Sequence, residues 1–365
     1  MINVTRPFLP PLEELLPKLE AIWESRNLSN GGPFALELEE KLSQLLGGEL
    51  YVSLFCNATV ALMVAQRVLG LKGEIITPAY SFAATSHAID WMGNTPCFAD
   101  IDPRTLTLCP KSVEEAVSEH TVGIMPLHCY GSVCDVEGIA TVAERHSLKI
   151  IYDACHSFGT EDAGGSVFRH GDISVVSFHA TKTFNTFEGG MLVCKSHEMK
   201  QQVDRLKNFG FVDEVTVDCV GINGKMTEFS AAIGLSQLDH LDWITSERKK
   251  RDSLYRQLLG TTIGIKCFEP NGLLVNNYSY FPIFITPEFP VGRDELYELL
   301  KAQGINARRY FYPLISEFKP YAGGTFAATD LEVSTRISHS VLCLPLYPDL
   351  PLHELERVCG IIQSR

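Results

Sequence analysis

The chain of 365 residues contains no apolar run of about 18 residues, the length that a membrane-spanning helix needs. Its first residues, Met1 to Pro11, include one arginine and two adjacent prolines but no long apolar stretch, so they do not resemble a secretory signal. Internal repeats and low-complexity segments are also missing. We therefore expect a cytoplasmic protein without membrane contact, long enough for a large core and two domains.

Basic residues are in the minority, with 31 Lys and Arg against 44 Asp and Glu and a net charge of −13. General nucleic-acid binding requires a basic face, so this balance argues against a nucleic-acid partner, although it permits a local basic pocket for an anionic substrate. The eleven cysteines include no CxxC pair, and several stand in apolar, strand-like surroundings. We expect reduced, buried thiols rather than disulfides or a metal site such as zinc.

From about residue 50 onward, short apolar segments alternate with segments of helical periodicity. This alternation predicts an α/β fold in which a mostly parallel, seven-stranded sheet is covered by helices on both faces. The expected strands are 51–55, 74–77, 95–99, 122–127, 149–153, 173–178 and 191–194. The expected helices between them are 59–69, 83–91, 113–117 and 136–146.

A long helical region, 227–259, leads into a smaller C-terminal part of α+β character. We place the boundary so that residues 1–245 form a large domain and residues 246–365 a small one. The charged cluster Glu247-Arg248-Lys249-Lys250-Arg251 is predicted to be a solvated helix face rather than a binding patch. The expected elements beyond it are strands at 279–285 and 343–346 and a helix at 293–303.

Lys182 is the most informative single residue. It closes the run Ser177-Phe178-His179-Ala180-Thr181-Lys182 just past a predicted strand, and Glu188-Gly189-Gly190 follows, where glycines allow the chain to turn back. A lysine in this place, with a serine hydroxyl before it, is suited to form a Schiff base with an aldehyde cofactor while the serine binds the cofactor's phosphate. Most lysines are solvated surface charges, so the assignment depends on the residues around it.

Other polar residues also follow strands at their carboxyl ends, where such sheets bind ligands. Asp153 could pair with the protonated nitrogen of a pyridine ring, which makes the ring an electron sink, or it could cap a helix or anchor a loop. Phe82 could stack on a planar ring or belong to the core. His128 could line a pocket or be a buried structural group. In Asn57-Ala58-Thr59, helix capping and anion binding by the helix N-terminus are compatible.

Together these segments resemble the nucleotide-sugar aminotransferases of the DegT/StrS type, a family of fold type I enzymes that use pyridoxal 5′-phosphate. The resemblance runs from Arg6-Pro7 to at least Leu314, and it is most specific between Ser177 and Gly190. It implies that Lys182 carries the cofactor as a Schiff base and moves the proton. The other cofactor contacts that it implies are Asp153 at the ring nitrogen, His156 at the ring oxygen, Phe82 on the ring face, and Ala58, Thr59 and Ser177 at the phosphate.

The segment Asn223-Gly224-Lys225-Met226-Thr227-Glu228 is similar to the part of the family that crosses into a partner subunit. The resemblance thus implies a homodimer with shared active sites, in which Asn223 completes the phosphate site of the other chain. Three residues depart from the family's pattern: Tyr152 stands where an acidic residue is common, Cys155 replaces an alanine, and Lys225 replaces a frequent arginine. Lys225 has a single ammonium charge where the family usually has the planar guanidinium of arginine. The sequence therefore does not decide whether Lys225 makes the anion contact expected near the partner subunit.

The activity that the resemblance implies is transfer of an amino group from L-glutamate to a nucleotide-linked keto-sugar. The version of the lysine motif in this chain is most similar to members that act at C4. The expected acceptor is therefore a dTDP-4-keto-6-deoxyhexose, and the expected product is the 4-amino-4,6-dideoxyhexose, used for surface polysaccharide such as the O-antigen of lipopolysaccharide. Residues expected to face the substrate are Glu188, Lys225, Arg308, Arg309, Tyr310 and Tyr312.

Alternatives are open at several points. The run 308–313 could instead be a surface turn with packed aromatic rings. A 3-keto-sugar aminotransferase would use the same cofactor residues. A sugar dehydratase on this scaffold would carry a histidine at the position of Lys182, which argues against that activity. A DNA-binding regulator would need a basic recognition helix, which the acidic chain does not offer.

Overall fold

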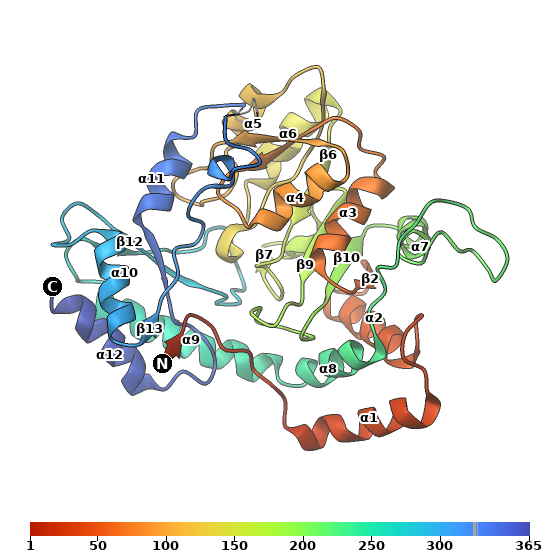
Figure 1. Cartoon of the computed structure of the whole chain (residues 1–365), viewed down its shortest axis with the longest axis horizontal. Coiled ribbons are helices and arrows are strands. Elements are labelled where there is room, and N and C mark those ends of the chain that lie inside the picture. The colour runs from red at the N-terminus through yellow and green to blue at the C-terminus, as the bar shows by residue number, and fades with distance from the viewer. Residues whose placement is uncertain (324–325, 327) are drawn as a thin grey trace.

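The central sheet has seven strands in the order β2-β10-β9-β6-β5-β3-β4 (Figure 1). The structure is a computed structural model that describes residues 1–323, 326 and 328–365. Strand β10 runs antiparallel to both its neighbours and the other strands are parallel to one another, so the predicted α/β fold is confirmed. The strands are β2 (Tyr51–Phe55), β3 (Glu74–Pro78), β4 (Thr95–Ala99), β5 (Thr121–Ile124), β6 (Lys149–Asp153), β9 (Ile173–Ser177) and β10 (Gly190–Cys194).

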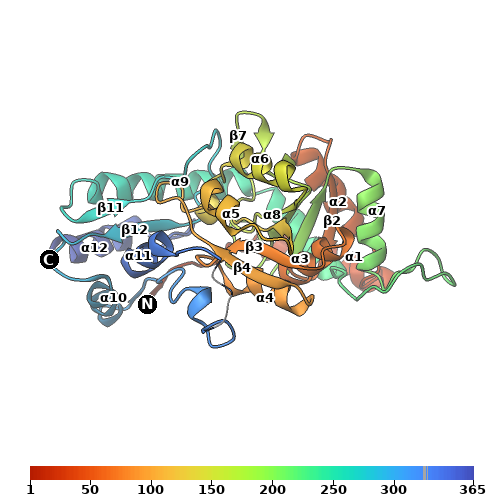
Figure 2. The same ribbon diagram turned by 90° about the horizontal axis from the view of Figure 1, so that it is seen from above.

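Helices cover both faces of this sheet because alternate strand residues point to opposite sides and both sides are apolar (Figure 2). On one face lie α3 (Ala58–Val68), α4 (Ala83–Trp91) and α7 (His197–Leu206). On the other lie α2 (Pro33–Leu45), α5 (Pro110–Ala116), α6 (Val136–His146) and α8 (Glu228–Leu238), with α1 (Leu12–Ser25) outside α8. None of the described helices is both long and apolar enough to span a membrane.

The C-terminal part forms a second layer with its own core. Its sheet, β11-β12-β14, packs with α9, α10 and α12, and the first residues of the chain join it through the parallel pair β1–β13. Residue 245 lies inside α9, so the division into residues 1–245 and 246–365 stays a prediction. The elements of this part are β1 (Ile2–Asn3), α9 (Leu241–Leu259), β11 (Ile265–Cys267), β12 (Phe281–Ile285), α10 (Arg293–Ala302), β13 (Ile305–Asn306), α11 (Glu332–Ser340), β14 (Val341–Leu344) and α12 (Leu352–Gln363). A small hairpin of β7 (Glu161–Asp162) and β8 (Gly165–Ser166) belongs to neither sheet.

Several predicted bounds differ from the structure. The helix predicted at 113–117 begins at Pro110, the strand predicted at 279–285 begins at Phe281, and the strand predicted at 343–346 spans Val341–Leu344 and ends before Pro345, which has no N–H for the ladder. The strand predicted at 122–127 ends at Ile124, because Pro126 has no N–H to donate to the ladder. The chain nevertheless stays beside β6, since Asp153 N donates to Pro126 O at 2.9 Å. The helical region 227–259 is two helices, with the break at Asp239 and His240 between α8 and α9.

The prediction of a solvated charged face on α9 is wrong for Arg248 and Arg251, which are 2% and 8% exposed. Arg248 Nη1 donates to the carbonyl oxygens of Tyr278, Ser279 and Leu346 at 3.2, 3.3 and 3.2 Å. One nitrogen of the guanidinium thus serves three carbonyl oxygens, whereas Nε is buried without a partner among the described residues. The eleven cysteines, all within the described residues, form no disulfide there; six are buried, as predicted, and five are only partly buried.

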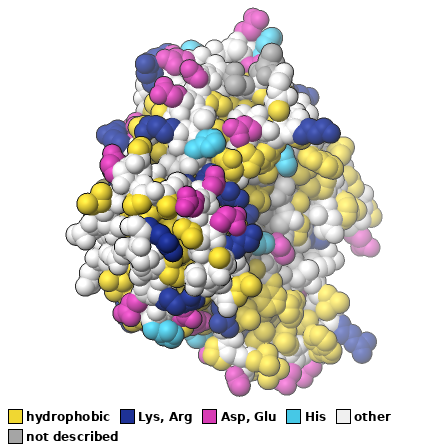
Figure 3. Space-filling model, turned by 60° about the vertical axis from the view of Figure 1, so that its left-hand side comes forward, with side chains coloured by type: hydrophobic (Ala, Val, Ile, Leu, Met, Phe, Trp, Pro, Cys, Tyr) yellow, Lys and Arg dark blue, Asp and Glu magenta, His cyan; other side chains and the backbone are white. Residues whose placement is uncertain are grey.

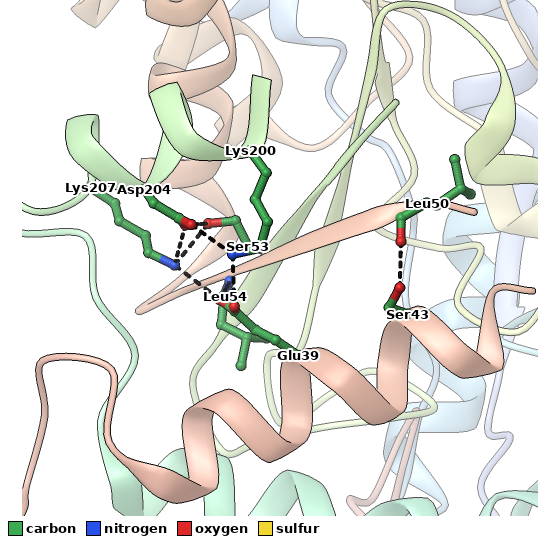
Figure 4. Close-up of polar contacts among 8 residues, drawn as sticks. All are labelled: Glu39, Ser43, Leu50, Ser53, Leu54, Lys200, Asp204 and Lys207. Carbon is green, nitrogen blue, oxygen red and sulfur yellow. Dashed lines mark hydrogen bonds and ion pairs between the residues drawn. The ribbon is translucent and has the colours of Figure 1, made fainter. Parts of the chain in front are cut away.

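A cluster of two lysines and two carboxylates fastens α7 and α2 to β2 (Figure 4). Lys207 Nζ lies 3.1 Å from Glu39 Oε1 and 2.8 Å from Ser53 Oγ, and Lys200 Nζ lies 2.6 Å from Asp204 Oδ2. The opposite charges balance, so the partly buried cluster carries no excess charge. Lys207 O also accepts from Gly224 N at 2.9 Å, which ties the cluster to the segment that carries Asn223.

Candidate active site

A cavity of about 250 Å³ lies at the carboxyl edge of the central sheet, where β2, β3, β6 and β9 end. The parallel strands place their carboxyl ends at one edge, so residues distant in sequence meet there. C-terminal residues close the cavity from the other side. Ten of the residues predicted for the site line it: Ala58, Thr59, Phe82, Asp153, His156, Ser177, Lys182, Glu188, Arg308 and Tyr310.

Lys182 stands on a turn that begins where β9 ends, and Lys182 N donates to His179 O at 2.9 Å. The turn has a rigid base, because Phe178 and Phe184 are fully buried and their rings meet edge to face at 4.8 Å. The amine itself points into the cavity, with Nζ 3.4 Å from Tyr280 Oη. A lysine on a packed base with its amine in a cavity is the arrangement that Schiff-base chemistry requires.

Asp153 ends β6 and is 4% exposed. Its Oδ1 accepts from Cys155 N at 3.1 Å, which anchors the loop, and its Oδ2 accepts from Thr85 Oγ1 at 2.8 Å. Both roles considered for this residue are therefore compatible, since one oxygen holds the loop while the carboxylate also lines the cavity. The hydroxyl of Thr85 has one proton and donates it to Asp153. In the 2.8 Å contact between Ser81 and Thr85, Ser81 must therefore be the donor.

His156 lies beside the lysine and is 4% exposed. Burial, together with the nearby charge of Lys182, holds the pKa of His156 well below its ordinary value, so the ring is neutral. Its Nδ1 accepts from Tyr130 N at 3.2 Å, so the proton is on Nε2. The ring therefore offers one N–H donor at the cavity.

The helix N-terminus predicted to bind an anion lies at the cavity, where β2 ends and α3 begins. Asn57 caps the helix, with Oδ1 accepting from Val60 N at 2.9 Å, as predicted, and the N-terminal residues Ala58 and Thr59 face the cavity. In the sheet, Gly190 pairs with both Phe55 and Ser177, which brings Ser177 level with the start of α3. A Cβ on Gly190 would meet Ala58 N at 2.8 Å, so only glycine allows this close approach.

The far wall comes from the C-terminal part. The segment with Arg308 and Tyr310 is fixed by a pair of bonds between Arg308 and Cys343, and the buried hydroxyls of Tyr80 and Tyr130 lie 2.9 and 2.8 Å from Tyr310 O. The Arg308 guanidinium carbon lies 4.6 Å from the centre of the Tyr310 ring. This wall therefore presents a cation and an aromatic ring in a fixed place.

Four predicted residues do not line the cavity. Arg309 pairs with Asp294 at 2.7 Å, and Tyr312 stacks under Arg293 at 4.4 Å. Lys225 Nζ donates to Asn208 Oδ1 at 2.7 Å, and Asn223 is exposed on the surface of the single chain. His128 does not line the cavity either: it is fully buried and stacked on Tyr152 at 4.7 Å, so it is a structural group, but only Nδ1 has a partner and Nε2 has none among the described residues.

Sequence reasoning missed Tyr280, Thr85 and His179. His179 and Tyr280 line the cavity, and Thr85 reaches it through Asp153. His179 is adjacent to the lysine motif and could have been found from its position. Tyr280 stands 98 residues after Lys182, and nothing in its local sequence marks it.

The donor set fits pyridoxal 5′-phosphate. The amine of Lys182 suits its aldehyde, the carboxylate of Asp153 its ring nitrogen, and the N–H of His156 its ring oxygen, while the start of α3 suits its phosphate. A mostly parallel sheet covered by helices, with these four groups at its carboxyl edge, is the arrangement of a fold type I enzyme that depends on pyridoxal phosphate.

Comparison with known proteins specifies the family. Residues 12–363 match the DegT/DnrJ/EryC1/StrS aminotransferase family, and the chain belongs to it. A Shigella dysenteriae protein named dTDP-4-amino-4,6-dideoxy-D-glucose transaminase is 50% identical over 363 residues, covering 100% of this chain and 98% of that protein. An Escherichia coli protein of the same name is 48% identical over 352 residues, covering 96% of this chain and 94% of that protein. The crystal structure of DesI with its TDP-sugar product superposes with a TM-score of 0.94 at 35% identity, covering 100% and 92% of the chains.

Proposed function

We propose that this aminotransferase converts a dTDP-4-keto-6-deoxyhexose to the dTDP-4-amino-4,6-dideoxyhexose, with L-glutamate as amino donor. The observation that carries the proposal is the amine of Lys182 inside a cavity with Asp153 and His156, in a chain about half identical over its whole length to two transaminases named for this product. The 4-amino position follows from those names and from the lysine motif.

Each cavity residue has a role that follows from its chemistry. Pyridoxal 5′-phosphate, when bound, supplies an aldehyde for amino groups and a ring that accepts an electron pair. Lys182 Nζ takes the proton from the α-carbon of glutamate in the first half-reaction and delivers a proton to the sugar C4 in the second. With the cofactor bound, the carboxylate of Asp153 would stabilise the protonated ring nitrogen, and the neutral His156 would donate a hydrogen bond from Nε2. Phe82, which is 55% exposed at the rim, would cover the ring face.

The substrate wall is suited to an anionic nucleotide sugar. Arg308 provides a fixed cation for phosphate or carboxylate, and Tyr310 a flat surface for a sugar or base. Glu188 stands at the opposite rim, 3.6 Å from His179 Nε2. We include Arg308, Tyr310 and Glu188 as substrate residues, whereas Arg309 and Tyr312 would need to leave their present partners to contribute.

The test is a product assay. The purified enzyme is incubated with L-glutamate and separate keto-sugars that differ in nucleotide and in ketone position, and products are identified by mass spectrometry and NMR. Amination at C4 of the dTDP-sugar supports the proposal, whereas amination only at C3 supports the 3-keto alternative. A deoxygenated sugar would indicate a dehydratase. No turnover together with a salt-sensitive shift of DNA would indicate a regulator.

The surface argues against that last outcome. On the face shown in Figure 3, dark blue basic side chains stand among magenta acidic and yellow hydrophobic ones instead of forming a continuous basic area. A chain with net charge −13 and mixed surface charge lacks the basic footprint that nucleic-acid binding needs.

We also propose that the enzyme acts as a cytoplasmic homodimer with shared sites and supplies sugars for surface polysaccharide such as the O-antigen. Support for the dimer comes from the loop between α7 and α8, which projects from the body of the chain (Figure 1 and Figure 2). It exposes apolar side chains, including Val215 at 88% and Val220 at 80%, and leads to Asn223. An apolar projection of this kind is suited to burial against a second copy.

A further inference from the structure

Lys182 has a polar neighbour that comes from the C-terminal layer. Nζ lies 3.4 Å from Tyr280 Oη and 6.0 Å from the centre of the Tyr280 ring. We propose that Tyr280 is a catalytic residue that orients the amine of Lys182 in both of its protonation states. The inference rests on the proposed function, because it takes Lys182 to be the reacting amine.

The backbone before Tyr280 is held on two sides. Asn277 Nδ2 donates to His156 O and Phe158 O, both at 2.9 Å, which attaches the segment to the loop after β6. From α9, Arg248 donates to the carbonyls of Tyr278 and Ser279. Bonds to buried backbone groups on both sides leave the segment little freedom, so the position of Tyr280 is set before any ligand binds.

The ring of Tyr280 is held as well. Its centre lies 4.8 Å from His156, 5.4 Å from Tyr130 and 5.4 Å from Tyr310. Aromatic rings at these separations pack in tilted and edge-to-face arrangements that fix their planes. The hydroxyl is therefore aimed at Lys182 by its surroundings, and the flexible lysine is the partner that adjusts.

A hydroxyl is the group that this position requires. A lysine that collects and delivers a proton alternates between an ammonium, which can only donate, and an amine, whose lone pair accepts. A phenol can accept from the first and donate to the second, whereas a carboxylate only accepts and would hold the ammonium form. Burial raises the pKa of Tyr280, so the phenol keeps its own proton throughout. A contact of this length is common in catalytic pairs before ligands bind, and it shortens afterwards.

The experiment compares Tyr280→Phe with the wild type, both as full-length protein loaded with pyridoxal 5′-phosphate. The glutamate half-reaction is followed by stopped flow as loss of the visible absorption, without any sugar. We expect Tyr280→Phe to slow this step on the order of tenfold to a hundredfold, the effect of losing one hydrogen bond to a charged group. Glutamate deuterated at the α-carbon should show a larger isotope effect in the variant, because proton transfer becomes more limiting.

Tyr278→Phe is the matched control, since it makes the same change two positions earlier on a ring outside the cavity. It should keep the wild-type rate and isotope effect. Cofactor affinity, measured by adding pyridoxal phosphate to the apoprotein, should change by less than about twofold in Tyr280→Phe. A Tyr280→Phe rate within twofold of the wild type, an equal loss in Tyr278→Phe, or a loss of cofactor affinity in parallel with the rate would each overturn the proposal.

The donor assignment is separable from this outcome. If glutamate leaves the wild-type absorption unchanged, a screen of the common amino acids identifies the donor that bleaches it, and the variants are compared with that donor. Such a result would show that glutamate is not the amino donor. The role of Tyr280 would still be decided by comparing Tyr280→Phe with Tyr278→Phe.

Discussion

The carboxylate of Asp153 is oriented by two side-chain hydroxyls in series. Ser81 donates to Thr85, and Thr85 donates to Asp153 Oδ2, each across 2.8 Å, and the two hydroxyl residues are 3% and 0% exposed. Water cannot replace such a donor inside a packed interior without space for it. The relay therefore fixes the direction in which the other lone pairs of the carboxylate face the cavity.

Replacing Thr85 with valine, which has nearly the same shape, removes the donor while keeping the packing. We expect the glutamate half-reaction to slow roughly tenfold, because a misdirected Asp153 stabilises a cationic ring nitrogen less well. Stopped-flow absorbance measures the rate. Thr77→Val is a control of equal burial, since Thr77 Oγ1 donates only to Met125 O at 2.9 Å and lies outside the cavity. Equal rates in both variants would exclude an orienting role for Thr85.

His128 predicts a pH dependence of stability. Its burial lowers its pKa to about 3 in the folded protein, against about 6.5 when unfolded. Above pH 6.5 both states are neutral there, and below it only the unfolded state takes up the proton. The free energy of unfolding should therefore fall by about 1.4 kcal/mol per pH unit at this site as the pH drops from 6.5 toward 3.

Urea denaturation between pH 7 and pH 4 tests this slope. His128→Asn keeps an acceptor for Cys134 N, which now donates to Nδ1 at 3.1 Å, but it does not titrate. As the pH drops, the free energy of unfolding of His128→Asn should fall less steeply than that of the wild type, with a difference in slope of about 1.4 kcal/mol per pH unit. His120→Asn, at an exposed site, is the control and should follow the wild-type curve. Parallel curves for wild type and His128→Asn would refute the assignment.

Among single residues, those at a strand end could be predicted from their position, whereas those that reach the site from elsewhere were predicted only in part. Asp153 and Ser177 end apolar strands and Lys182 follows one, and a parallel sheet brings such ends together. Arg309 and Tyr312 were expected at the substrate because of their type, but local sequence does not reveal that Asp294 and Arg293 face them. Tyr280 depends on a contact between layers, which no spacing encodes.

Helix α9 is fixed within the C-terminal part by the side chain of Arg248. Its cation is buried without a carboxylate partner among the described residues, and burial lowers its pKa to about 10. The three carbonyls that it satisfies belong to the approach to β12 and to the chain after β14. One side chain thus fixes α9 against both neighbouring segments.

Arg248→Met fills a similar volume but removes the donors. We expect a loss of roughly 3 kcal/mol in the free energy of unfolding, because the carbonyls stay buried without partners, partly offset by removal of the buried charge. Urea denaturation at neutral pH measures it. Lys249→Met, at the exposed neighbouring position, should change stability by less than about 0.5 kcal/mol. Losses of similar size in the two variants would show that the carbonyl contacts of Arg248 contribute little.

Elements with a strong apolar pattern were predictable, and those held by polar contacts were not. The strands at 51–55, 95–99 and 149–153 match the structure because their runs are short, apolar and bounded by turns. Helix α7 is mostly polar and buries only Val203 and Leu206, and the ion cluster of Figure 4 fastens its other side. In α1, an internal proline at position 17 disfavours a helix, yet packing on α8 outweighs it.

At the scale of the whole molecule, the fold class followed from the alternation of elements, but the strand order did not. Sequential strands β2 and β3 are separated in the sheet by β10, β9, β6 and β5. Such an order depends on which crossovers bury the most apolar surface together, and a single sequence does not specify it locally. Arg308 and Tyr310 of the cavity wall were predicted from the family resemblance and their residue types, whereas the strand order that determines which edge they face was not.

The proposed dimer predicts complementation between inactive variants. Lys182→Ala and Asn223→Ala should each be poorly active alone. When they are dissociated and reassociated together, one site of each heterodimer would carry both lesions and the other neither, so activity should return to about a quarter of wild type per total site with random pairing. The measurement is glutamate-dependent turnover of heterodimers verified by mass spectrometry.

A mixture of Lys182→Ala with Asp153→Asn is the control, because these two residues belong to the site of the same chain. Both side chains lie in the cavity of one chain, so each heterodimer site would carry one lesion and no recovery is expected. If the Asn223 mixture also failed to recover while heterodimers were present, Asn223 would not act across the interface and the shared-site proposal would be wrong.

The pairing of β1 with β13 has a consequence for biosynthesis. Ile2, a core residue, is made more than three hundred positions before its strand partner, Ile305. The amino terminus must therefore remain unpaired through most of translation, while the central sheet can already assemble. Met1 is 96% exposed, so an extension placed before it is tolerated, but deletion of the first three residues would leave the last-formed layer without its closing strand.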